Sequence, residues 1–214
     1  YGKSKSTEYN GKTIPYAGLV YDLTEDVALY ASYTEIFNPQ TQVDQSGSRL
    51  DALEGENYEI GVKARVLDDA ELSVAMFQTK QDNLPELAGY NGGQAYYRAL
   101  QGIESQGWEA ELAGELLPGL QASVGYTFVD ITDAEDQHAR PYAPKHLVRS
   151  MATYRLPQLP KAKVGASYNW QTLTENASVE QDAYGLLNLM ASYEIDPNWT
   201  VSANLNNLTD EKYW

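Results

Sequence analysis

Apolar and polar residues alternate along most of this chain with a period of two. Residues 57–66, NYEIGVKARV, separate into an apolar phase (Tyr58, Ile60, Val62, Ala64, Val66) and a polar phase (Asn57, Glu59, Gly61, Lys63, Arg65). This alternation is typical of a β-strand with one apolar and one polar face. It predicts ten strands and no helix, with the strands near residues 13–23, 27–37, 56–67, 71–83, 102–116, 120–131, 145–156, 161–171, 184–195 and 199–208.

The connections between the predicted strands alternate in length. Short turns centre near residues 25, 69, 118, 159 and 197, whereas long polar loops fill residues 38–55, 84–101, 132–144 and 172–183. Short turns at one end of the strands and long loops at the other are typical of an outer-membrane β-barrel. The predicted fold is therefore all-β, an antiparallel and meandering transmembrane barrel wall.

The aromatic residues support a membrane-spanning wall. The chain has 17 Tyr and 4 Trp beside only 3 Phe, and rings with a polar group suit the boundary between apolar and wet phases. On the apolar phase they gather at both strand ends: Tyr33, Phe37, Tyr58, Trp108, Tyr126, Phe128, Tyr168 and Trp170 beside the long loops, and Tyr21, Tyr154, Tyr193 and Trp199 beside the short turns. Two girdles around an aliphatic band are expected of a barrel in a bilayer, with the polar phase facing a wet lumen. A soluble β-sandwich with a recognition role is the alternative, but its core gives no reason for rings at both ends.

Composition argues against several kinds of partner, metal site and membrane span. The 214 residues carry 15 basic and 30 acidic side chains, a net charge of −15 that argues against nucleic acid as a partner. The chain has no Cys, which excludes disulfides and Cys-based metal sites. No window approaches the length of apolar sequence that a transmembrane helix needs.

Catalytic or metal-binding chemistry finds little support in the chain. His138 and His146 read as surface residues, and no nucleophile-elbow motif accompanies them. The acidic stretch DITDAEDQHARPY lacks the glycine and the final Glu of an EF-hand loop. Three carboxylates, Glu109, Glu111 and Glu115, alternate along one strand, where they fit a solvated lumen wall better than an acid–base pair. We expect no catalytic residue, no metal ligand and no enzyme activity.

Several blocks of the chain resemble one known family. They are YAGLVYDLTEDVALYASYTEIFNPQ, EGENYEIGVKARVLDDAELSVAMFQTKQDNL, GIESQGWEAELAGEL, YAPKHLVRSMATYRLP and NLNNLTDEKYW. In order and spacing they resemble the C-terminal half of the barrel of TonB-dependent ferric-siderophore receptors, especially those for ferric pyoverdine and ferric coprogen. The resemblance implies a multi-pass protein of the outer membrane of a Gram-negative bacterium, in contact with lipid.

The same resemblance implies how residues 1–214 are organised. In that family a plug domain, which carries the segment that engages TonB, fills a 22-stranded barrel. The expectation is therefore an open partial barrel of about ten of the 22 strands, without the plug and the final strand. Trp214 is then expected in a loop after the tenth strand, because Asp210, Glu211 and Lys212 in succession do not fit a lipid-facing strand.

The long loops hold the candidate ligand-binding residues, because binding residues concentrate on loops that a rigid scaffold positions. The stretch PELAGYNGGQAYYRAL offers rings for stacking and one cation, and IFNPQTQ offers amide donors: Tyr90, Tyr96, Tyr97 and Arg98, with Asn38 and Gln40. The alternative is that these Tyr merely extend the aromatic girdle. The expected ligand is a ferric siderophore, which chelates the iron itself, so the protein needs no cofactor. A TonB-dependent transporter of a sugar or of cobalamin is the alternative within the same class.

Overall fold

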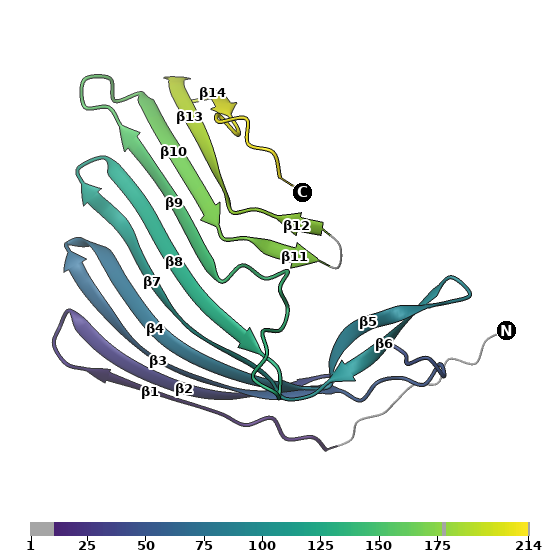
Figure 1. The fold of residues 1–214 in the computed structure, drawn as a ribbon. Helices are drawn as coiled ribbons and strands as arrows, with labels where there is room; N and C mark the ends of the chain where they lie inside the picture. Colours follow the sequence, from purple (N-terminus) through teal and green to yellow (C-terminus); the bar gives the residue numbers. More distant parts are fainter. Residues whose placement is uncertain (1–10, 177–178, 214) are drawn as a thin grey trace.

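One antiparallel sheet dominates the computed structural model, which describes residues 11–176 and 179–213. Its strands run in chain order across the sheet, each joined to the next, except where small hairpins intervene (Figure 1). The ten strands are β1 (Tyr16–Asp22), β2 (Val27–Asn38), β3 (Leu53–Leu67), β4 (Asp69–Asp82), β7 (Ile103–Leu117), β8 (Leu120–Thr132), β9 (His146–Arg155), β10 (Ala162–Gln171), β13 (Tyr184–Asp196) and β14 (Trp199–Leu205). All ten predicted strands are thus confirmed, with ends that shift by a few residues.

Two of the predicted loops contain strands of their own. Residues 84–101 form a hairpin of β5 (Leu84–Asn91) and β6 (Gln94–Leu100). Within residues 172–183, β11 (Thr174–Asn176) pairs with β12 (Val179–Gln181). The two long connections predicted here thus join the wall strands as expected, but each contains a short hairpin that the sequence pattern did not predict. Both hairpins lie at the long-loop end of the sheet (Figure 1).

The strand register separates the side chains onto two faces. Directly paired residues lie on the same face of a sheet, so the pairing of Ile60 with Met76, Met76 with Trp108 and Trp108 with Phe128 follows one apolar row. A neighbouring row on the opposite face runs through Lys63, Ser73, Glu111, Gly125, Arg149 and Asn169. We call the first the apolar face and the second the polar face. Every aromatic residue that the sequence assigns to the two girdles lies on the apolar face.

The polar face is closely covered by its own side chains. The Tyr30 ring lies across Gly61, its partner on β3, and a Cβ at Gly61 would come within 2.6 Å of that ring. The Tyr30 hydroxyl also donates a hydrogen bond of 2.7 Å to Glu59 Oε1. At Gly107 a Cβ would collide with the Phe128 carbonyl oxygen and come within 2.9 Å of the Phe77 ring. Glycine is therefore needed at both positions, at Gly61 because an aromatic ring occupies the space and at Gly107 mainly because the backbone does.

Few side chains of the wall are buried. Among the described residues the buried apolar side chains are Ala52, Ala70, Ala75, Leu84, Ile103 and Ala162. Large apolar side chains such as Ile60 and Met76 remain 61% and 64% exposed on the apolar face. Such a continuous apolar surface indicates a face that meets an apolar medium rather than water.

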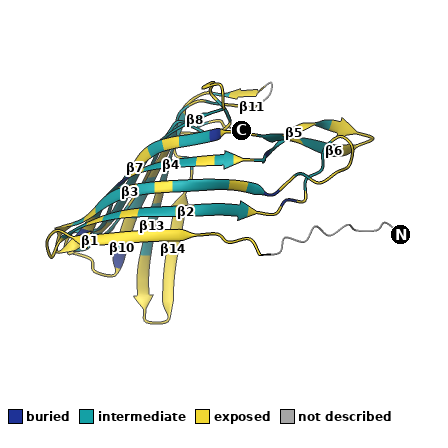
Figure 2. Cartoon of the chain, turned by 90° about the horizontal axis from the view of Figure 1, so that it is seen from below, coloured by how far each residue is buried: buried dark blue, intermediate teal, exposed yellow. Residues whose placement is uncertain are grey.

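The sheet is open in the part of the chain that the structure describes. Its order begins at β1 and ends at β14, and both strands are exposed along their whole length (Figure 2). The predicted open partial barrel is confirmed. No helix long and apolar enough to cross a membrane occurs within residues 11–176 and 179–213. Trp214, predicted in a terminal loop, lies outside the described residues.

Candidate ligand-binding site

The β5–β6 hairpin projects beyond the long-loop end of the sheet (Figure 1). Its turn is Gly92–Gly93, between the paired residues Asn91 and Gln94. Both glycines have positive φ, 57° and 83°, as a two-residue type I′ turn requires. These two glycines therefore close the turn of the hairpin.

A small buried cluster anchors the base of this hairpin. Leu84 at the start of β5 and Ile103 at the start of β7 are 4% and 1% exposed, and Ala52, just before β3, is similarly buried. Gln40 is buried beside them, and its Nε2 donates to the carbonyl oxygens of Asp51 and Asn83 at 2.7 and 2.6 Å. This amide therefore joins the β2–β3 loop to the first residue after β4.

Asn83 completes the anchor from the other side. Its backbone adopts a left-handed conformation (φ 59°), its Nδ2 donates to the Ala52 carbonyl at 3.0 Å, and its Oδ1 accepts from Gln101 Nε2 at 2.7 Å. The Gly102 N–H donates to Asp82 Oδ1 at 2.7 Å. These bonds hold the two ends of the hairpin together where β4 ends and β7 begins.

The β2–β3 loop supports the hairpin along one edge. The Tyr97 N–H donates to the Val43 carbonyl at 2.8 Å. Next to Val43, the Asp44 carboxylate accepts hydrogen bonds from the Ser46 hydroxyl (2.6 Å) and the Ser48 N–H (2.9 Å). The Ser46 hydroxyl, followed by the backbone N–H groups, lowers the pKa of Asp44 below its ordinary value.

The hairpin divides the four predicted contact residues between its two faces. Arg98 is paired with Glu86, and Tyr96 with Gly89, on one face. Tyr90 and Tyr97 lie on the other face, where Tyr97 is paired with Leu87. Tyr90, near the tip, is 69% exposed. The structure therefore brings Tyr96 and Arg98 together and separates them from Tyr90 and Tyr97.

On the first face Tyr96 and Arg98 form a platform. A Cβ at Gly89 would lie 2.8 Å from the Tyr96 hydroxyl oxygen, so glycine there lets the ring lie across the hairpin. The Arg98 Nε and Nη2 atoms both contact Glu86 Oε2, in an ion pair whose side chains are 67% and 43% exposed. We call Tyr96, Arg98 and Glu86 the hairpin platform.

The two amide candidates near β2 have different surroundings. Asn38 is exposed at the last position of β2, opposite Leu53. Gln40 is buried, and both bonds from its Nε2 go to backbone carbonyls. Gln40 thus has a structural task in this arrangement, whereas Asn38 remains open to solvent.

The β8–β9 loop folds back on the end of β8. Lys145 Nζ lies 2.6 Å from Asp130 Oδ1, and His138 Nδ1 lies 3.7 Å from the same oxygen. The Asp133 carboxylate accepts from the Glu135 and Gln137 N–H groups, which makes this acidic stretch a tight turn. Within the described residues no group of three or more His, Asp or Glu side chains could hold a metal ion.

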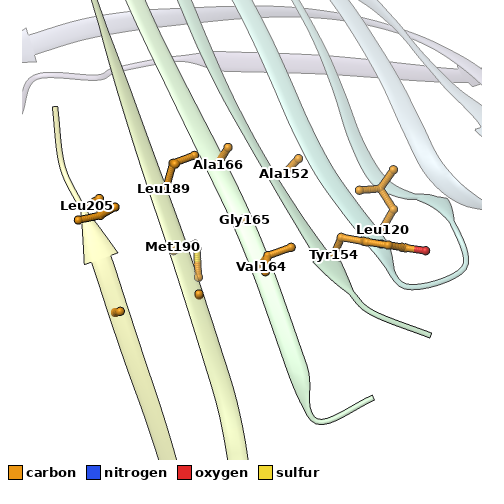
Figure 3. A pocket seen from close by; sticks show the side chains of 11 residues that line it. Leu120, Ala152, Tyr154, Val164, Gly165, Ala166, Leu189, Met190 and Leu205 are labelled. Carbon is orange, nitrogen blue, oxygen red and sulfur yellow. The ribbon is translucent and has the colours of Figure 1, made fainter. Parts of the chain in front are cut away.

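The apolar face also carries a groove of about 550 Å³ that runs across β8, β9, β10, β13 and β14 (Figure 3). Alanines form much of its floor, between the larger side chains of Leu120, Tyr154, Val164, Leu189 and Leu205. It offers a polar chelate no charged partner, so it belongs to the apolar face of the wall and not to the ligand site.

Fold and faces together define the wall of an outer-membrane β-barrel, and comparison with known proteins gives the family. The family model described as TonB dependent receptor-like, beta-barrel, matches residues 1–208. The chain therefore belongs to the TonB-dependent receptor family, whose barrels lie in the outer membrane of Gram-negative bacteria.

Individual relatives agree with this assignment. The chain is 41% identical to the ferric-pyoverdine BN7/BN8 receptor and 38% identical to the ferric-pyoverdine 358 receptor of Pseudomonas putida, over 97% and 95% of its length. It spans about a quarter of each relative, 26% in both cases. The ferripyoverdine receptor of Pseudomonas aeruginosa, solved with bound ferripyoverdine, superposes with a TM-score of 0.81 at 34% identity, over 96% of this chain and 30% of that one.

Sequence reasoning missed two contributors to the site, Glu86 and Asn83. The hairpin itself was signalled, because an Asn-Gly-Gly turn flanked by strand-forming residues predicts one. A regular register from that turn would place Leu87 opposite Arg98, and the irregularity between Leu87 and Gly89 brings Glu86 there instead. Asn83 gave no comparable signal, since its role depends on Gln40 and Ala52, which lie more than thirty residues away along the chain.

Proposed function

We propose that the protein containing this chain is an outer-membrane receptor that binds a ferric siderophore of the pyoverdine class and imports it with energy from TonB. Residues 1–214 then form part of the wall of a larger barrel, of 22 strands in this family, whose lumen holds a plug that engages TonB. The 26% coverage of the relatives and the open sheet both support this proposal. Transport, rather than catalysis, is the activity proposed.

The hairpin platform is the observation that carries the proposal for ligand contact. It places an aromatic ring and a guanidinium on one exposed face, at the end of the sheet that the long loops surround. A siderophore chelate is polar and often aromatic or anionic, so a ring can stack on it and a guanidinium can pair with its oxygens. The iron stays within the siderophore, which leaves no task for metal ligands of the protein.

Removal of both groups tests this assignment. In the intact receptor, Tyr96→Ala with Arg98→Ala should weaken ferric pyoverdine binding by roughly ten- to several-hundred-fold, because a charged hydrogen bond contributes about 1.5–3 kcal/mol and stacking adds somewhat less. Titration of purified receptor in detergent measures the affinity, and heat-modifiable gel mobility checks that the barrel is folded.

A matched control comes from the β8–β9 loop. There Arg140 lies over the Tyr142 ring, 5.5 Å from its centroid. Arg140→Ala with Tyr142→Ala removes the same two residue types from a different loop and should reduce the affinity much less. An unchanged affinity in the hairpin variant would remove Tyr96 and Arg98 from the binding site.

A further inference from the structure

Arg98 has an anionic partner within its own hairpin. Glu86 lies directly opposite Arg98 in the β5–β6 register, and its Oε2 is contacted by both Nε and Nη2 of the guanidinium. This contact occupies one edge of the guanidinium, the edge that a carboxylate prefers. Any acidic group of a ligand that approaches Arg98 along this edge must therefore displace or share Glu86.

We propose that Glu86 determines selectivity at the hairpin platform, by competing with an acidic oxygen group of the ligand for Arg98. The inference rests on the proposed function, since it assigns a role within the same site. With Arg98 paired to Glu86, the platform is a neutral ion pair on the face that carries Tyr96, and not an unpaired cation. A ligand without an acidic group gains only the ring and the remaining N–H donors of Arg98. A ligand with an acidic group gains an ion pair with the Arg98 guanidinium, while the contact between Arg98 and Glu86 is lost.

The geometry makes this competition possible. Both side chains are substantially exposed, at 67% for Arg98 and 43% for Glu86, so the pair can open without disturbing a buried core. The hairpin itself is fixed by its turn glycines and by the anchor around Gln40, so opening the pair does not require the backbone to move. Exposed ion pairs of this kind stabilise a fold only slightly, by about 1 kcal/mol or less. Because so weak an ion pair can be broken at little cost, Arg98 can exchange Glu86 for an acidic group of the ligand.

The test compares two forms of one ferric pyoverdine on the intact receptor, one with its side-chain carboxyl group free and one with that group amidated. Glu86→Gln should raise the affinity for the free-carboxyl form by about two- to fivefold, the range expected for an exposed charge pair, and leave the amidated form unchanged. In an Arg98→Gln background the same substitution should have no effect on either form, because the cation that Glu86 competes for is gone.

Glu135→Gln provides the matched control. Glu135 is exposed in the β8–β9 loop, and its loss changes the receptor charge by the same amount without touching the platform. Titrations at about 0.15 M salt, where charges separated by more than about 8 Å are screened, should show no change for this variant. Heat-modifiable mobility again checks folding of every variant.

The outcomes separate the inference from the proposed function. If the unaltered receptor binds ferric pyoverdine but Glu86→Gln leaves its affinity for the free-carboxyl form unchanged or lowers it, the competition does not exist. An equal rise for both ligand forms would overturn it too, because it would indicate a general charge effect. An unaltered receptor that binds neither form would contradict the proposed function itself, and the inference with it.

Discussion

The wall and the β5–β6 hairpin are both antiparallel β-structure, but they are stabilised by different surroundings. In the wall, each strand has one apolar and one polar face, and the two faces meet different media. In the hairpin, Arg98 and Glu86 lie on one face and Tyr97 and Leu87 on the other, and beyond Leu84 at its base every strand residue is intermediate or exposed. The hairpin therefore gains little from burial along its length.

A different set of interactions takes the place of burial in the hairpin. Its conformation depends on the Gly92–Gly93 turn at the tip and on the Gln40 and Asn83 hydrogen bonds at the base. The stability of the wall should therefore depend mainly on the face on which a residue is substituted. The stability of the hairpin should instead depend mainly on the residues at its tip and its base.

The largest expected effect distinguishes the two faces of the wall. Val124 lies on the apolar face, paired with Leu112, and its neighbour Ser123 lies on the polar face, where its hydroxyl donates to Glu111. Val124→Arg should destabilise the barrel by about 2–4 kcal/mol, the cost of a cation that faces lipid near the bilayer midplane. Ser123→Arg should cost far less, because the guanidinium lies in a wet lumen beside a carboxylate.

The folded fraction of each variant, measured by heat-modifiable mobility across a urea series, gives the two free energies of unfolding. Ser123 is a better control than Gly61, since a side chain at Gly61 would collide with the Tyr30 ring. Equal losses in the two variants would contradict the assignment of the faces.

A smaller effect is expected at the base of the hairpin. Gln40→Ala removes the donor of two part-buried hydrogen bonds, to the carbonyl oxygens of Asp51 and Asn83, at a total cost of about 1–3 kcal/mol. Because the bond is local, hydrogen exchange should become faster in residues 84–100 while exchange in the wall strands stays the same. Gln45→Ala, at an exposed position of the same loop, is the control and should change neither. Faster exchange throughout the wall would show that the anchor is not local.

The smallest effect concerns the turn at Asp44. Its pKa is lowered from 3.8 by the Ser46 hydroxyl and backbone N–H groups, so the ionised carboxylate stabilises the turn at neutral pH. This stabilisation should be lost as the pH falls from about 3.8 through the lower folded-state pKa. Amide protection at Ser46 and Ser48, followed by hydrogen exchange, should decrease over that range. Asp44→Asn should remove the pH dependence, and a variant that keeps it would assign the titration to another group.

How far the sequence predicts each region follows from the same contrast. The wall strands are predictable because a residue such as Ile60 and its neighbour Gly61 meet different media, which forces the period of two. The strands of the hairpin escape prediction because an irregularity between Leu87 and Gly89 interrupts the alternation, and only the Asn-Gly-Gly turn indicates them.

The candidate site is predictable in composition but not in arrangement. Tyr96 and Arg98 can be chosen from the sequence as ring and cation, but the pairing of Arg98 with Glu86 depends on the register irregularity between Leu87 and Gly89. The sequence predicts Gln40 as a hydrogen-bond donor to the ligand. In the structure its amide is buried and donates to two backbone carbonyls, which is a structural role. Contacts of this kind join distant segments, so no local pattern reports them.

The proposed function requires that the long-loop end, with its hairpin, faces the cell exterior and that the short turns face the periplasm, as is typical of outer-membrane barrels. Single Cys substitutions at Gln94, beside the hairpin tip, and at Asp68, in the short turn between β3 and β4, test it directly in a receptor without other Cys. Intact cells are treated with a membrane-impermeant thiol reagent, and lysed cells serve as the control for reactivity. The account predicts labelling at position 94 in intact cells and at position 68 only after lysis. Labelling of intact cells at position 68 but not at position 94 would contradict it.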